Sequence, residues 1–163
     1  MSSRPRVLVA FVGTALVVAY AVVGSLQVLV WNPLAAVPGA TLSEIHVELD
    51  RVGQSFSPAP VILWAVLGVA AAASLAVSAL RPDGFALSHL AFGYSLLLVG
   101  GAPSFSFVAF SPGMQLADGF GISGGDHSPW ARPLYVTSFL AMIVAIATAG
   151  LAITTSRRRA HTS

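Results

Sequence analysis

Long apolar stretches alternate along this chain with short polar segments. Four of the apolar stretches are long enough, at about 1.5 Å per residue in a helix, to cross the roughly 30 Å hydrocarbon core of a bilayer. They predict membrane-spanning helices at about residues 7–31, 59–80, 85–110 and 134–155. We therefore expect an all-α integral membrane protein in which residues 1–163 form a single four-helix transmembrane domain. The first stretch exceeds the apolar region of a secretory signal peptide, about 7–15 residues, so we interpret it as an uncleaved span.

The third apolar stretch is the least regular of the four. Gly100, Gly101 and Pro103 interrupt it, and a proline removes one helical hydrogen bond and crowds the preceding turn. After them, residues 104–107 alternate polar and apolar side chains, which is the period of a strand. One interpretation ends the helix near Gly101 and continues in an extended segment. We favour the other, a kinked helix that continues to Phe110, because unpaired backbone groups are costly in lipid.

The polar segment between the first two spans has a pattern of its own. Thr41 and Glu44 have the spacing of a capping box at the start of a helix, and Gly53 is a suitable end. The sequence predicts a short amphipathic helix at about residues 41–53, which either rests on the bilayer surface or caps the helix bundle. The apolar positions along one of its faces are Leu42, Ile45, Leu49 and Val52.

Composition agrees with a membrane protein and excludes several functions. Of the 163 residues, 56% are hydrophobic and only 9% are charged, and the mean hydropathy is +0.83. Ordinary soluble domains carry roughly a quarter charged residues. Cysteine is absent from the sequence, which excludes disulfide frameworks, cysteine-ligated metal centres and thiol catalysis.

The arginines predict the orientation of the chain. Cytoplasmic loops are enriched in basic residues, and tryptophan favours the membrane interfaces. We expect a multi-pass protein of the plasma membrane with both termini cytoplasmic. The arginines on the cytoplasmic side are then Arg4, Arg6, Arg81 and the Arg157–Arg159 cluster, against Arg51 and Arg132 outside. The tryptophans near the outer face are then Trp31, Trp64 and Trp130. With this placement, the arginines behind the net charge of +2 are explained by contact with the membrane surface. We therefore expect no nucleic-acid partner.

Small residues at one-turn spacing predict where helices approach each other closely. The second and the fourth span each contain such a series, and either series can face another helix of this chain or a second subunit. The two series are Gly68, Ala72 and Ala76, and Ala141, Ala145 and Ala149.

The polar segments supply the candidate chemistry. His46 and Asp50 share one face of the predicted amphipathic helix, and Asp126 and His127 lie in a glycine-rich loop expected at residues 111–131. If the loops meet, these four side chains are candidate ligands of a divalent metal or candidate acid–base groups. Their spacing is not that of a metal motif such as H-E-x-x-H, and exposed Asp and His pairs are commonly only solvated. We predict no catalytic residue and no cofactor.

The spans contain few polar side chains. Gln27 lies near the end of the first span and His89 about one turn into the third, whereas acidic and basic residues are missing from all four, which argues against an ion-coupled transporter. These observations favour a small non-enzymatic accessory or assembly subunit that interacts through helix seams and extracytoplasmic loops. The alternative is a membrane enzyme or small transporter with an outward-facing His/Asp site. The expected partners are the lipid bilayer and other membrane subunits, or a second copy of the chain.

Overall fold

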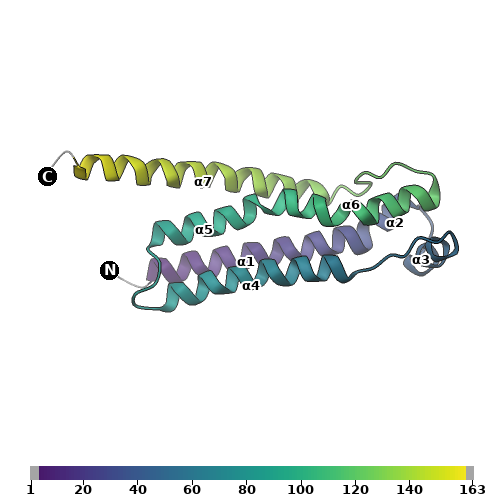
Figure 1. Ribbon diagram of the computed structural model, residues 1–163, viewed down its shortest axis with the longest axis horizontal. Coiled ribbons are helices and arrows are strands. Elements are labelled where there is room, and N and C mark those ends of the chain that lie inside the picture. The colour runs from purple at the N-terminus through teal and green to yellow at the C-terminus, as the bar shows by residue number, and fades with distance from the viewer. Residues whose placement is uncertain (1–3, 161–163) are drawn as a thin grey trace.

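The four predicted spans are present in the structure, a computed structural model that describes the backbone of residues 4–160 and the side chains of residues 4–150. The protein is an all-α integral membrane protein. Its long apolar helices run side by side in an elongated bundle, with the start of the first helix and the end of the last at the same end (Figure 1). The spans are Arg4–Ala36, Ala59–Leu80, Leu87–Phe120 and Ala131–Gly150. The side chains of the predicted Arg157–Arg159 cluster lie outside the described part.

The first span is a continuous helix with an irregular end. Its parts are α1 (Arg4–Leu26), the π-helical turn η1 (Gln27–Trp31) and α2 (Asn32–Ala36). At the end of η1 the backbone N–H of Asn32 donates to the carbonyl of Gln27, five residues back. Pro33 has no N–H to donate to the preceding turn, so a wider turn loses little hydrogen bonding here. The helix therefore extends past residue 31, where the sequence pattern had placed its end.

The amphipathic helix α3 (Leu42–Arg51) confirms the prediction for residues 41–53. Thr41 and Glu44 form the capping box: the Thr41 N–H donates to Glu44 Oε2 at 2.7 Å, and the Glu44 N–H donates to Thr41 Oγ1 at 3.3 Å. The bond from the Thr41 backbone, assisted by the Thr41 hydroxyl, holds the pKa of the Glu44 carboxyl below its ordinary value. Gly53 adopts a φ of 77° directly after the helix.

The position of α3 decides between the two placements that the sequence left open. Ile45 and Leu49 are completely buried, and they pack against Leu116 of the third span together with Phe120 and Phe56. The helix therefore caps one end of the bundle, opposite the end where the first helix begins (Figure 1). We call this the α3 end.

The third span bends where the sequence predicted but continues further. Its parts are α5 (Leu87–Val99) and α6 (Gly101–Phe120), which Gly100 separates. The kinked-helix interpretation is confirmed, since the residues after the break are helical. The predicted end at Phe110 was wrong: the helix runs to Phe120, and Gly121 ends it with a left-handed φ of 65°. Contacts with α3 explain the difference, because Leu116 in this extra part is buried beneath that helix.

The glycines after residue 110 suggested a loop. On α6 they instead allow other segments of the chain to approach the helix closely. A β-carbon at Gly113 would lie 2.8 Å from the carbonyl oxygen of Gly124, so only glycine lets the following loop cross the helix here. A β-carbon at Gly119 would collide with Leu49 of α3. The loop between the third and fourth spans is therefore shorter than the predicted 111–131 and covers residues 121–130.

The remaining spans are α4 (Ala59–Leu80) and α7 (Ala131–Ala160). α4 packs mainly against α1, and α7 packs mainly against α5. Ala72, Ala141 and Ala145 from the two predicted small-residue series are buried within the chain, whereas a β-carbon added at Gly68 would meet no other atom within 4 Å. These three alanines therefore pack against the protein's own helices.

Candidate functional site

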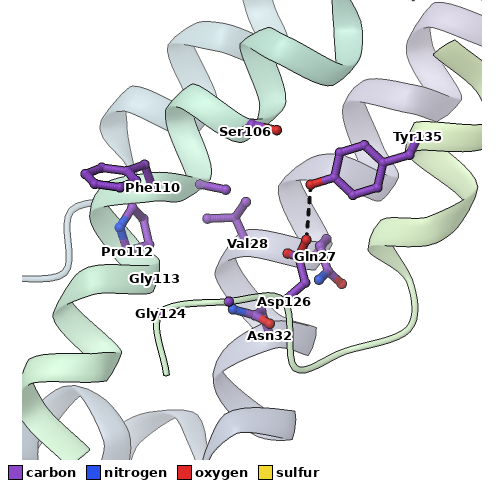
Figure 2. A pocket seen from close by; sticks show the side chains of 12 residues that line it. Gln27, Val28, Asn32, Ser106, Phe110, Pro112, Gly113, Gly124, Asp126 and Tyr135 are labelled. Atoms are coloured by element: carbon purple, nitrogen blue, oxygen red, sulfur yellow. Dashed lines mark hydrogen bonds between the residues drawn. The ribbon is translucent and has the colours of Figure 1, made fainter. Parts of the chain in front are cut away.

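A cavity of about 160 Å³, lined by both polar and apolar residues, lies at the α3 end of the bundle. Its walls come from η1 and the start of α2, from α6, from the loop 121–130 and from Tyr135 near the start of α7 (Figure 2). Backbone irregularities surround it, since η1 is π-helical and Pro112 lies inside α6. A π-helical turn within a regular helix frequently marks a functional site.

Gln27, the first residue of η1, is the most unusual side chain of the cavity. It is 0% exposed, and neither Oε1 nor Nε2 of its amide has a hydrogen-bond partner within the described part of the chain. Buried polar groups in native proteins are nearly always paired, and an exception commonly indicates a bound water, ion or ligand. The Gln27 amide offers one acceptor and two donor hydrogens in a largely apolar surrounding.

Asp126 supplies the charge of the site. Among the described residues that line the cavity it is the one charged side chain, and it is itself exposed. Its Oδ2 accepts a hydrogen bond of 3.1 Å from the Tyr135 hydroxyl of α7. Figure 2 shows this bond, with the Gln27 side chain beside it in this view, and all three residues line the cavity.

Asn32 fixes the loop that carries Asp126. Its Oδ1 accepts the backbone N–H of His127 at 2.7 Å and that of Ser128 at 3.4 Å. The His127 ring, through Nε2, pairs with the carbonyl oxygen of Ser123 at 2.8 Å and closes the loop on itself. Asn32 and His127 therefore position Asp126 over the cavity.

The four residues predicted as metal ligands do not form a common site in the described structure. Within residues 4–150, no three His, Cys, Asp or Glu side chains form a group that could hold a metal ion. His46 stacks on Phe56 with ring centroids 5.1 Å apart, and Asp50 is exposed on α3. His127 uses its ring to bond the loop, and only Asp126 lines the cavity.

Sequence reasoning recognised parts of this site but not its assembly. Gln27 stood out as a polar residue within an apolar span, and that isolation was the available signal. Asn32 and Tyr135 carried no such signal, because a residue beside a proline and a tyrosine at a span end are both common at membrane interfaces. The cavity also depends on how the loop crosses α6 at Gly113, which one sequence does not reveal.

A second polar cluster occupies the break between α5 and α6. Ser138 of α7 accepts the Ala102 N–H at 3.1 Å and donates to the Leu98 carbonyl at 2.7 Å, so its hydroxyl replaces the helical bond missing between these two residues. The Tyr20 hydroxyl lies 3.2 Å from Ser138 Oγ and is the third hydrogen-bond partner of the Ser138 hydroxyl. Nearby, Trp64 Nε1 donates to Ser104 Oγ at 2.9 Å. All these groups are paired, so the cluster holds the bend together.

Comparisons of the chain with known protein families, with curated proteins and with solved structures found no match.

Proposed function

We propose that this protein is a non-enzymatic accessory or assembly subunit of the plasma membrane, a single domain with both termini cytoplasmic, that binds another membrane protein along the groove between α1 and α4. The groove measures about 580 Å³ and is lined by residues of these two helices. Helices associate in lipid where small side chains let their backbones come close. The small residues that line the groove are Ala21, Ser25, Ala65, Ala70 and Ala73.

The exposure of this groove is the observation that carries the proposal. Ala70 and Ala73 are exposed, unlike Ala72, which is buried between helices of the same chain. From Ala65 to Ala73 the small residues extend over about 12 Å of helix at 1.5 Å per residue, which is more than two turns. A partner helix fits such a depression and gains packing that lipid chains provide less well.

The lack of cysteine in the chain makes a site-specific test straightforward. We would place single cysteines in the groove (S25C) and on an exposed face of α7 (V136C), label each with a thiol-reactive benzophenone, and irradiate native membranes so that the photoreactive end bonds to any neighbouring chain. A discrete adduct is expected from S25C but not from V136C. Its mass identifies the partner, and an adduct of twice the chain mass indicates self-association.

Leucine substitutions then test whether the groove itself makes the contact. A70L and A73L fill the groove at exposed positions, so they are expected to abolish the S25C adduct while the protein stays folded. A19L adds the same bulk at an exposed position of α1 outside the groove and is expected to leave the adduct intact. Equal adducts from S25C and V136C, or adducts that survive both groove substitutions, would contradict the proposal.

A membrane enzyme or small transporter with an outward-facing polar site is the second candidate. It is supported by Asp126, which lines the cavity at the α3 end and which the sequence analysis had singled out. The discriminating measurement is the divalent metal content of the purified protein and of its D126A and H127A variants. A stoichiometric metal that either substitution removes would favour this candidate over the subunit.

A further inference from the structure

We propose that the cavity at the α3 end is a binding site for a small ligand that carries a primary ammonium group close to an oxygen acceptor. The inference goes beyond the subunit proposal, because it concerns a different surface of the protein. It rests on three observations: a buried unpaired amide at Gln27, a single carboxylate at Asp126, and a cavity of about 160 Å³ between them.

The charge of the cavity determines the sign of the charge that the ligand carries. Among the described lining residues no basic side chain accompanies Asp126, so an anion would meet repulsion and a cation attraction. The Tyr135 hydroxyl occupies one carboxylate position by donating to Oδ2, which leaves other lone pairs of Asp126 free. Three N–H donors of an ammonium group match these acceptors.

The Gln27 amide determines what else the ligand carries. Its Oε1 needs a donor and its Nε2 needs an acceptor, and both atoms are buried and unpaired. A bare metal cation would pair with Oε1 alone and leave Nε2 unpaired. An ammonium group near a hydroxyl, ester or phosphate oxygen satisfies both atoms and Asp126 together.

The size of the cavity limits the ligand to a small molecule or to one end of a larger one. A cavity of about 150 Å³ holds a molecule the size of benzene. An ethanolamine group fits this volume, and it occurs both as a free amine and as the headgroup of phosphatidylethanolamine. The exposure of Asp126 gives either source a route into the cavity.

Ethanolamine is the probe, and two tryptophans supply the signal. Trp31 is the last residue of η1 and Trp130 is the last residue of the loop, and their rings lie 5.2 Å apart next to the elements that form the cavity. In nanodiscs of phosphatidylcholine, ethanolamine is expected to change the tryptophan emission in a saturable way and to raise the melting temperature. Glycerol, which lacks the ammonium group, is expected to do neither.

Matched variants test the assignment. Q27L and D126N are each expected to weaken ethanolamine binding at least about tenfold, which is the loss expected when one buried or charged hydrogen-bond partner is removed. Q115L and D118N make the same changes on α6 outside the cavity and are expected to bind normally. The thermal unfolding of Q27L shows whether this variant is folded, and D126N, at an exposed position, repeats the test independently.

A second set of nanodiscs identifies the source of the ligand. If phosphatidylethanolamine in the bilayer abolishes the response of the wild-type protein to free ethanolamine, the site holds the lipid headgroup; if the response is unchanged, it holds the free amine. The proposal is overturned if neither form of ethanolamine produces a response, if glycerol produces the same one, or if Q27L and D126N respond like the wild type.

Discussion

The two irregular places in the membrane helices differ in how completely their polar groups are paired. At the break between α5 and α6, Ser138 supplies partners for the backbone groups that the bend releases, and the Tyr20 hydroxyl pairs with Ser138 in turn. At the π-helical turn η1, the Gln27 side chain is just as buried, yet neither of its amide atoms has a partner in the described structure. Both places depart from regular helix, but only the second leaves hydrogen-bonding capacity unused.

This difference distinguishes an irregularity that is stabilised within the fold from one that leaves a buried polar group unpaired. A buried polar group without a partner costs stability, and a chain that only had to fold would replace it with an apolar residue. A buried polar group that supplies the hydrogen bonds missing at a bend offsets the cost of its own burial, as Ser138 does. The bend is therefore part of the scaffold, whereas the unpaired amide of Gln27 is what supports the ligand site proposed for the cavity beside it.

The largest effect is expected at the bend. S138A removes the partner of the Leu98 carbonyl, the Ala102 N–H and the Tyr20 hydroxyl at once. Hydrogen bonds between helices in membranes contribute about 0.6 kcal/mol on average and up to about 1.7, so the free energy of unfolding should fall by roughly 2 kcal/mol. Reversible unfolding in mixed micelles measures it.

S74A is the matched control for this substitution, because Ser74 bonds only to Ala70 in its own helix and is exposed. Its free energy of unfolding should stay close to that of the wild type. If S138A and S74A had the same free energy of unfolding, the stability of the bend would not depend on the Ser138 hydroxyl. That result would contradict the distinction between the paired bend and the unpaired amide at the cavity.

Two neighbouring glycines at the bend allow a second test of how this region is stabilised. A β-carbon at Gly101 would lie 2.7 Å from the Tyr20 ring, so G101A displaces the tyrosine that pairs with Ser138. We expect a loss of about 1–3 kcal/mol, which is typical of overpacking. At Gly100 the nearest contact is 3.4 Å, so G100A should be neutral or slightly stabilising. Melting temperatures of both variants in one detergent provide the test, and equal losses would contradict it.

Much of the fold could be predicted because each decisive signal is local. Apolar length determines the spans, the Thr41 and Glu44 pair determines the start of α3, and proline and glycine determine the bend. The end of the third span could not be predicted, since residues 111–120 become helical by packing Leu116 beneath α3, a contact between distant segments.

The cavity was harder to predict for the same physical reason. Of its polar residues, Gln27 and Asp126 could be noticed individually, but they lie about a hundred positions apart in the sequence. Their meeting depends on Asn32, which holds the loop through His127, and on the close crossing at Gly113. Neither contact has a periodic pattern in the sequence.

Two buried amides at the α3 end are expected to respond to substitution with opposite signs. N32L leaves the His127 and Ser128 N–H groups without their acceptor, so the free energy of unfolding should fall by about 1–3 kcal/mol. Q27L removes an amide that has no partner, so the ligand-free protein should be unchanged or more stable by up to about 1 kcal/mol. The test measures the free energy of unfolding of both variants in ligand-free detergent. A large loss of stability in Q27L would show that the Gln27 amide is needed for folding.

The smallest effect is expected where a polar pair is satisfied at the surface. The Thr41 bonds lower the pKa of the folded Glu44 carboxyl below its ordinary value of 4.5, so the charged form stabilises α3. This stabilisation is fully present above about pH 4.5 and is lost as the pH falls through the lower pKa of the folded state. Amide hydrogen exchange across α3, corrected for the intrinsic pH dependence, should therefore quicken only as the pH falls below about 4.5. E44Q keeps an acceptor for the Thr41 N–H without titrating in this range, so its exchange should show no such step, and a step of equal size in E44Q would assign the transition to another group.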